Sequence, residues 1–300
     1  MDLSIKIVSL HCKHNIYAMF IFNDKDSLEA FLSPLINQKK TIGLVPTMGA
    51  LHEGHQSLIQ QSVNENQITV VSIFVNPTQF NNSEDLEKYP RTLERDITKI
   101  KEINDLILVY APTVEDIYGN NPVAKQYDFD GLEQQMEGKQ RPGHFDGVGT
   151  IITKLFAIVK PTNAYFGEKD FQQLQIIKKL VDKNSLPVNI IGCPIFRAES
   201  GLAMSSRNER LSDEAKNKAA FIYKTLQDAK NKFQTEPAKD VINFVYTAFK
   251  NNPDFELEYF EIADEETLLS CTEKETHKKY RGFITVFIEN IRLIDNIALY

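Results

Sequence analysis

Short apolar runs alternate with amphipathic stretches along the first two thirds of the chain. The runs are rich in Val, Ile and Leu, as strands buried on both faces are, and they lie at residues 41–45, 68–75, 106–111, 164–166 and 187–195. Apolar residues spaced three and four apart predict helices between them, at residues 56–66, 148–159 and 171–183 and in a segment that ends at Ile103. A further strand and helix are expected from Met19 onward. This order indicates an α/β fold with a Rossmann-like parallel sheet.

Beyond residue 195 the pattern changes to amphipathic helices followed by alternating strands. The helices are expected at residues 214–233 and 238–250, and the strands at 257–262, 283–289 and 292–299. We predict a smaller C-terminal α+β domain here. Because no dense polar cluster is visible in it, we expect it to act as a lid. The expected organisation is an N-terminal extension at 1–18, a Rossmann-like domain at 19–195 and the lid domain at 196–300.

Two segments of the first domain lack a strand or helix pattern. Residues 81–88 are polar and are expected to form a loop. Residues 118–145 are rich in Gly, Pro, Asn and Gln and include the basic run GKQRPGH. Because long loops inside compact domains are usually lids or binding loops, residues 118–145 are a candidate binding loop.

Composition narrows the class of protein. The chain has 300 residues, 42% of them hydrophobic, and its 34 basic and 41 acidic residues give a net charge of −7, which is opposite to the balance of a nucleic-acid-binding protein. The cysteines, Cys12, Cys193 and Cys271, are widely spaced, so neither a disulfide framework nor a zinc site is predicted. No apolar run has the length of a membrane helix, and the first residues do not read as a signal peptide. We expect a cytoplasmic protein that binds neither nucleic acid nor membranes.

The strongest chemical signal is His52-Glu53-Gly54-His55, which a short loop connects to the predicted strand at residues 41–45. The spacing places two imidazoles on one face of a first helical turn. A helix N-terminus favours phosphate, and preorganised donors stabilise the charge that builds up during adenylyl transfer. Alternatively, such a pair is an exposed helix start or half of a metal site.

Further polar clusters follow later strands. Asn76 and Gln79 are candidate contacts for a small polar substrate, although Asn-Pro also starts many turns. Lys169 is placed to neutralise a phosphate, Gly167 permits close approach of the backbone, and Gln173 lies in the first turn of the next helix. A solvated helix start would have a similar composition.

A loop at residues 197–208 combines flexibility, hydroxyls and cations. Gly201 gives freedom of movement, and the polar groups belong to Arg197, Ser205, Ser206 and Arg207. Such a loop can close over a nucleotide and bring charge to the leaving pyrophosphate. The alternative is an ordinary surface loop before a helix.

These clusters together resemble the pantoate-β-alanine ligase (pantothenate synthetase) family of the HxGH nucleotidyltransferase superfamily. The matching stretches lie between about residues 40 and 210, in the family's order and spacing: PTMGALHEGH, FVNPTQF, YPRT, RPGHFDGV, KLFAIV, FGEKDFQQL and GLAMSSRN. The C-terminal third resembles the family in length and layout more than in motif.

The resemblance implies a two-step reaction that uses ATP as co-substrate and Mg²⁺. Pantoate attacks the α-phosphate to give pantoyl adenylate and pyrophosphate, and β-alanine then displaces AMP to form pantothenate. His55, His52, Lys169 and Arg207 would be the catalytic residues, with electrostatic stabilisation as the preferred role of the imidazoles. The expected ATP-binding residues are Met48, Gly49, Ala50, Leu51, His52, Glu53, Gly54, His55, Gly167, Glu168, Lys169, Asp170, Phe196, Met204, Ser205, Ser206 and Arg207.

Substrate and metal positions follow from the same resemblance. Gln79 and Gln173 match the family's pantoate-binding amides, Gln79 is also expected beside β-alanine, and Asn76 is added as a neighbouring candidate. Asp96 is a weak candidate for Mg²⁺, which usually binds through phosphates and water. The family forms homodimers through its nucleotide-binding domain, so a homodimer is expected.

Two residues depart from the family's pattern, and three other functions stay open. Phe196 stands where valine is more frequent at the adenine contact, and Ser200 stands where aspartate is usual. The first alternative is an HxGH adenylyltransferase for a phosphate-bearing acceptor, which would need more cations in the acceptor pocket. The second is an aminoacyl-tRNA synthetase, which the negative charge disfavours. The third is a catalytically silent nucleotide sensor.

Overall fold

The computed structural model describes residues 6–8 and 19–300 and divides the chain into two compact units. The first unit holds the chain up to Gly167 together with Gln173–Cys193, and the second holds Glu168–Gln172 together with Pro194–Tyr300. Of the expected extension at residues 1–18, only residues 6–8 are described. They form the short strand β1 (Lys6–Val8), and the remainder of that segment lies outside the described residues.

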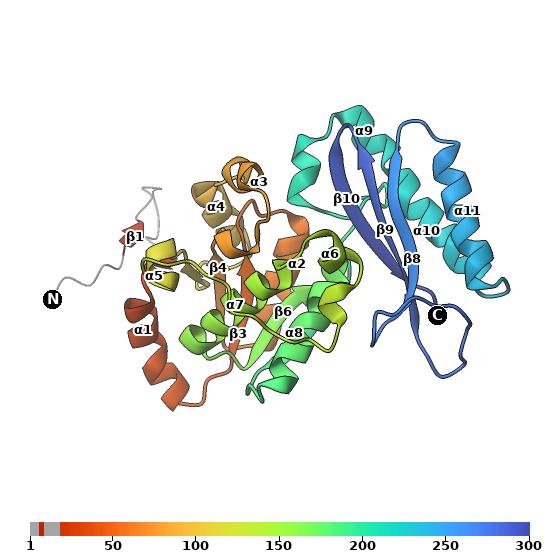
Figure 1. Ribbon diagram of the computed structural model, residues 1–300. Helices are drawn as coiled ribbons and strands as arrows, with labels where there is room; N and C mark the ends of the chain where they lie inside the picture. The colour runs from red at the N-terminus through yellow and green to blue at the C-terminus, as the bar shows by residue number, and fades with distance from the viewer. Residues whose placement is uncertain (1–5, 9–18) are drawn as a thin grey trace. The chain divides into compact units, whose positions relative to one another are not determined.

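The first unit is built on a sheet whose described strands follow the order β1-β2-β5-β4-β3-β6-β7. Figure 1 labels β1, β3, β4 and β6 of this sheet. All neighbouring strands are parallel except β1 and β2, which are antiparallel. Beyond β1, the strands are β2 (Met19–Phe22), β3 (Ile42–Thr47), β4 (Ile68–Ile73), β5 (Leu108–Tyr110), β6 (Asn163–Gly167) and β7 (Asn189–Cys193). The predicted Rossmann-like α/β fold is confirmed, and each expected strand lies within a few residues of its predicted bounds.

Helices of the first unit connect these strands and bury their apolar faces against the sheet. The longer ones are α1 (Lys25–Asn37), α2 (Glu53–Glu65), α4 (Leu93–Ile103), α7 (His144–Val159) and α8 (Phe171–Lys183). One buried cluster joins Val45 of β3 and Val71 of β4 to Ile59 of α2 and Ile100 of α4. This packing fixes the start of α2 at the carboxyl ends of β3 and β4, which are the ends where open α/β sheets bind ligands.

Four local predictions differ from the structure, and the first is the start of the expected helix at 148–159, which begins at His144 as α7. The expected loop at 81–88 contains α3 (Ser83–Lys88), which Asn82 caps and which buries no residue, so no apolar period could indicate it. The segment 118–145 contains the short helices η2 (Leu132–Gln134) and α6 (Met136–Gln140), and the end of α5 (Val114–Tyr118). The expected helix at 214–233 is two helices, α9 (Asp213–Lys218) and α10 (Ala220–Phe233), with Ala219 between them.

The second unit pairs an antiparallel sheet with helices. Its strands β8 (Glu256–Asp264), β9 (Tyr280–Ile288) and β10 (Ile291–Ala298) follow the order β10-β9-β8. The apolar faces of α10 and α11 (Ala238–Lys250) share one buried core with this sheet, including Leu226, Val245 and Val286. The predicted α+β character of this part is confirmed.

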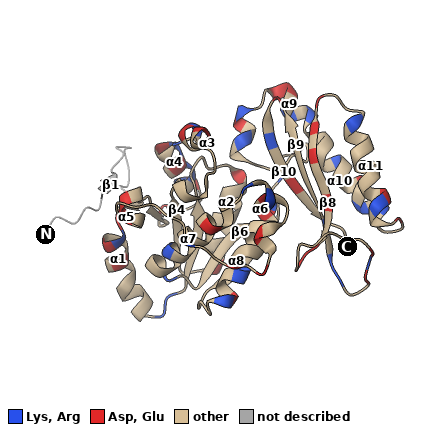
Figure 2. Ribbon diagram, in the orientation of Figure 1, with Lys and Arg blue, Asp and Glu red and all other residues tan. Residues whose placement is uncertain are grey.

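Charged residues of both signs are interspersed over the helices of each unit (Figure 2). In the described part of the chain, no helix is long and apolar enough to span a bilayer.

Candidate active site

The loop between β3 and α2 is held in place by one buried carboxylate. Gly49 and Ala50 have φ angles of 80° and 49°, and the conformation of Ala50 is costly for a residue with a side chain. Asp96 of α4 is only 1% exposed, and its oxygens accept the amides of Ala50 at 3.0 Å and Leu51 at 2.7 Å. A Cβ at Gly49 would lie 3.0 Å from Asp96 Oδ2, so the loop requires glycine there.

His52 and His55 form a reciprocal cap at the start of α2. Nδ1 of His52 accepts the Gly54 amide at 3.2 Å, Nδ1 of His55 accepts the His52 amide at 3.3 Å, and the two ring centroids are 4.0 Å apart. Because each Nδ1 accepts a hydrogen bond, this network assigns the proton of each neutral ring to Nε2. Both imidazoles are therefore donors through Nε2 at the positive end of a helix.

Asn76 and Gln79 lie together at the carboxyl end of β4, and both are buried. Asn76 Nδ2 donates to Gln79 Oε1 at 3.1 Å and to the Gly147 carbonyl at 3.2 Å, and Tyr118 donates its hydroxyl to Asn76 Oδ1 at 2.7 Å. Burial raises the pKa of Tyr118, so its hydroxyl keeps the proton that it donates. Gln79 Nε2 contacts Met48 Sδ at 3.2 Å, which joins this amide cluster to the loop before α2.

The segment at residues 118–145 contributes contacts that the sequence did not predict individually. His144 Nδ1 lies 2.8 Å from the carbonyl oxygen of Gln79, and Arg141 Nη2 lies 3.4 Å from the same oxygen. Gly147 packs so closely on the preceding turn that a Cβ would lie 2.3 Å from the Thr78 carbonyl. In the sequence, only the basic run GKQRPGH indicated that this segment contacts the candidate site.

The second unit holds the predicted residues Lys169 and Ser205 around one small hollow, which Asn208 also lines. Burial raises the pKa of the Asp295 carboxyl, which lines the same hollow, and the positive charge of Lys169 acts against this increase. Ser205 caps the short helix η4 (Ser206–Arg210) by accepting the Arg207 amide at 3.3 Å. Phe196 is 44% exposed, and Gln173 lies in the first unit at the start of α8.

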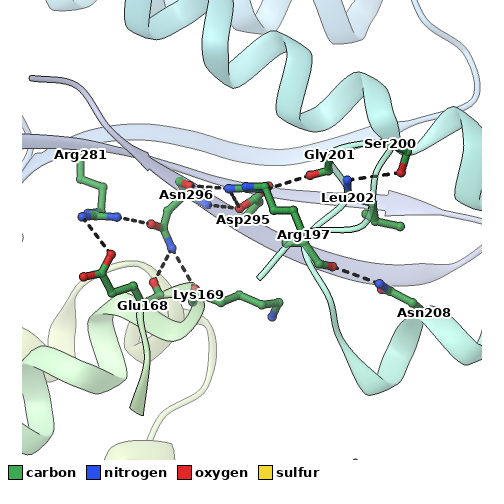
Figure 3. Close-up of polar contacts among 11 residues, drawn as sticks. Glu168, Lys169, Arg197, Ser200, Gly201, Leu202, Asn208, Arg281, Asp295 and Asn296 are labelled. Carbon is green, nitrogen blue, oxygen red and sulfur yellow. Dashed lines mark hydrogen bonds and ion pairs between the residues drawn. The ribbon is translucent and has the colours of Figure 1, made fainter. Parts of the chain in front are cut away.

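The second unit also contains a dense polar cluster, so the prediction that this part of the chain lacks one is wrong. Arg197 donates to both Asp295 oxygens at 2.6 and 2.9 Å and to the Gly201 carbonyl at 3.1 Å (Figure 3). Its guanidinium also stacks 3.8 Å from the ring centroid of Tyr223. Arg197 therefore stabilises the base of the loop. This differs from the expectation that its charge would neutralise a phosphate.

Comparison with known proteins identifies the family. A sequence model described as Pantoate-beta-alanine ligase matches residues 20–298. The chain belongs to the pantoate-beta-alanine ligase family. The pantothenate synthetase of Flavobacterium psychrophilum is 60% identical over 94% of this chain and 100% of its own length.

Solved structures of the family agree in fold. Pantothenate synthetase from Thermus thermophilus superposes with a TM-score of 0.85 at 37% identity, covering 93% of this chain and 99% of its own. The Francisella tularensis ligase, described as complexed with beta-gamma ATP and β-alanine, gives a TM-score of 0.77 at 37% identity and covers 94% and 98% of the two chains. The expected family, ligase activity and fold are confirmed.

Proposed function

We propose that this chain joins pantoate to β-alanine through a pantoyl adenylate, with the residues described above in defined roles. The observation that carries the proposal is the reciprocal cap of His52 and His55, which turns both Nε2–H groups into donors at the N-terminus of α2. A site of this kind suits a nucleotide triphosphate at the carboxyl edge of a parallel sheet. The loop from Met48 to His55 would bind ATP.

In the first step the pantoate carboxylate attacks the α-phosphorus, and the bond to the β-phosphate oxygen breaks to release pyrophosphate. A carboxylate is ionised at neutral pH, so this step requires no general base. His52 and His55 stabilise the negative charge on the α-phosphate oxygens. Their role is electrostatic, because neither Nδ1 is available to accept a proton.

The second unit supplies cations and hydroxyls for the phosphates. Lys169 stabilises the leaving pyrophosphate as a compact point charge, and Arg207 adds a second cation from the loop after β7. The remaining ATP contacts would come from the backbone and side chains of Gly167, Glu168, Asp170, Phe196, Met204, Ser205 and Ser206.

Gln79 and Gln173 bind pantoate through amides, which bind hydroxyls while leaving the carboxylate reactive. Both hydrogen-bonding ends of the buried Asn76 amide have oxygen partners in the protein, whereas Gln79 Nε2 donates to the weak acceptor Met48 Sδ. We therefore assign Asn76 to orienting Gln79 and Gln79 to the substrate. In the second step the amine of β-alanine, beside Gln79, attacks the acyl carbon of the adenylate. The acyl-oxygen bond breaks, AMP leaves, and the amine loses its proton as the amide forms.

Magnesium enters, in this proposal, as part of the MgATP substrate. Within the described residues no group of three or more His, Cys, Asp or Glu could hold a metal ion. Both oxygens of Asp96 already accept hydrogen bonds. Phosphate and water ligands, which Mg²⁺ commonly keeps, fit this arrangement better than Asp96, which we assign to the loop.

We further infer that the enzyme works as a homodimer in the cytoplasm. The family resemblance supports the dimer, and the need for ATP supports the location.

The experiment that tests the proposal adds the substrates in order. Enzyme with MgATP and pantoate should release a stoichiometric burst of pyrophosphate, and AMP should appear only after β-alanine is added. Pyrophosphate release with another acceptor, and none with pantoate, would overturn the substrate assignment. ATP binding without pyrophosphate release from any acceptor would instead support the silent sensor.

A further inference from the structure

The turn that contains Lys169 is hydrogen-bonded to the carboxyl end of β10. This turn, η3 (Glu168–Asp170), groups with the second unit although the strand before it belongs to the first. Asn296 donates its Nδ2 hydrogens to the carbonyl oxygens of Glu168 and Lys169, each at 2.9 Å (Figure 3). One side-chain amide therefore fixes two consecutive peptide groups at the base of the Lys169 side chain.

Asn296 is itself fixed by its neighbours. Its Oδ1 accepts Arg281 Nη1 at 2.6 Å, its backbone amide donates to Asp295 Oδ1 at 2.7 Å, and it is only 2% exposed. Because a guanidinium only donates and a carbonyl only accepts, the orientation of the Asn296 amide is unambiguous. Both hydrogens of Nδ2 have acceptors, so the side chain has no donor left for a substrate.

Arg281 contacts the same turn from its other side. Its Nη2 lies 3.8 Å from the Glu168 carboxylate, its Nε donates to Glu265 at 2.8 Å, and its guanidinium stacks 4.0 Å from the ring centroid of Phe171. The residues on both sides of Lys169 are thereby held by one buried arginine. A lysine side chain is flexible, so its reach depends on where its backbone is fixed.

Asp295 and Asn296 also anchor the loop that contains Ser205 and Arg207. Arg197, near the start of that loop, donates to the Asp295 carboxylate and, at 3.2 Å, to the Asn296 carbonyl. Two segments that are proposed to bind ATP phosphates are thus tied to two adjacent residues of β10. Asp295 and Asn296 together form the β10 anchor.

We propose that the β10 anchor, with Arg281, positions Lys169 for the departure of pyrophosphate. The inference rests on the function proposed above for Lys169. Asn296 is a positioning residue, because it acts through the turn and does not touch the substrate. In this proposal the second unit contributes a charged group to the first chemical step and does not act only as a lid.

The test compares Asn296→Ala with two controls in the full-length enzyme. Gln234→Ala removes another amide that donates to two backbone carbonyls, those of Lys230 and Leu299. Val241→Ala removes methyl groups from the buried core of the same unit and controls for lost stability. Single-turnover pyrophosphate release from ATP with pantoate is measured for each protein, together with the unfolding temperature.

Misplacing a catalytic group by a fraction of an ångström to an ångström costs up to about a hundredfold in rate, so Asn296→Ala should slow pyrophosphate release roughly ten- to a hundredfold. The KM for pantoate should stay within about twofold of wild type, because uniform binding is untouched. Asn296→Asp retains the shape and the contact to Arg281 but lacks both donors to the turn, and it should show the same loss.

The decisive readout is a double-mutant cycle with Lys169→Ala. If Asn296 acts through Lys169, Asn296→Ala should cost less than about threefold in the Lys169→Ala background. Fully additive losses, or an equal loss in Val241→Ala at a similar unfolding temperature, would refute the positioning role. Failure of the wild-type enzyme and of Gln234→Ala to release pyrophosphate with pantoate would instead refute the proposed function.

Discussion

At the scale of single residues, the proposed chemistry depends on donors that the backbone has already oriented. His52 and His55 each accept an amide at Nδ1, and this commits the other nitrogen of each ring to donation. Asn76 orients Gln79 in the same way, through an amide whose partners are all within the protein. The site is therefore preorganised for charge stabilisation.

His55→Ala is expected to slow adenylate formation by at least about a hundredfold, since removing one oxyanion-type donor has that effect in other enzymes. Pre-steady-state pyrophosphate release with pantoate measures it. Gln60→Ala, on the exposed face of the same helix, is the matched control. An unchanged burst rate in His55→Ala would contradict the role of the imidazole.

Asn76→Ala is expected to raise the KM for pantoate, as Gln79→Ala is. The KM for ATP should stay within about threefold of wild type, because only the binding of pantoate is weakened. Steady-state kinetics with each substrate varied measure both constants. In the double variant the second substitution should add little. Equal losses for ATP and pantoate would point to a folding defect.

His52, His55, Gln79 and Lys169 could be predicted as candidate site residues from the sequence because each follows a strand within a recognisable motif. The division of labour among them could not. The Asn76 amide has oxygen partners at both ends, among them Tyr118 and Gly147, which are distant in sequence, whereas the Gln79 amide donates to the sulfur of Met48, a weak acceptor. Such pairing is a property of the folded chain.

At the scale of secondary-structure elements, α4 has a function that its own sequence does not show. Its first turn carries Asp96 to the loop between β3 and α2, where the carboxylate stabilises a left-handed backbone at Ala50. The helix thus sets the geometry of the loop that is proposed to bind ATP.

Asp96→Ala should lower the free energy of unfolding by about 2–4 kcal/mol, because it leaves two buried amides without an acceptor. It should also raise the KM for ATP. Urea denaturation and steady-state kinetics measure the two effects. Glu94→Ala, which removes an exposed carboxylate from the same helical turn, should change neither. Full stability in Asp96→Ala would show that the loop does not need this anchor.

Apolar periodicity predicted the elements that bury a face and failed where none is buried. It indicated β3, β4 and α11 closely, but it missed α3, whose residues are all at least partly exposed. It also placed the start of α7 too late, because Gly147 interrupts the apolar period near the true start of the helix. That glycine is required by its close contact with the Thr78 carbonyl, which apolar periodicity cannot reveal.

At the scale of the whole molecule, the candidate residues belong to both units. The first unit carries the two imidazoles and the amides proposed to bind pantoate, and the second carries Lys169 and the loop with Ser205 and Ser206. The sequence predicted a change of texture near residue 195. It could not show that residues 168–172 pack with the second unit, because a turn this short has no apolar periodicity that would indicate its packing partner.

A chain that begins at Met19 should keep its fold and its specific activity. The described part of the preceding segment is β1, a three-residue strand at the edge of the sheet that pairs only with β2. Unfolding temperature and pantothenate formation, compared with the full chain, measure the effect. A severe loss of either would show that the first eighteen residues are needed.

The central claim is that pantoate is activated as an acyl adenylate, and isotope transfer tests it most directly. Pantoate labelled with ¹⁸O at both carboxylate oxygens is turned over with MgATP and β-alanine, and the products are analysed by mass spectrometry. Attack on the α-phosphorus followed by acyl-oxygen cleavage predicts one ¹⁸O in each AMP and one retained in pantothenate. Label in inorganic phosphate or pyrophosphate, with unlabelled AMP, would contradict the account.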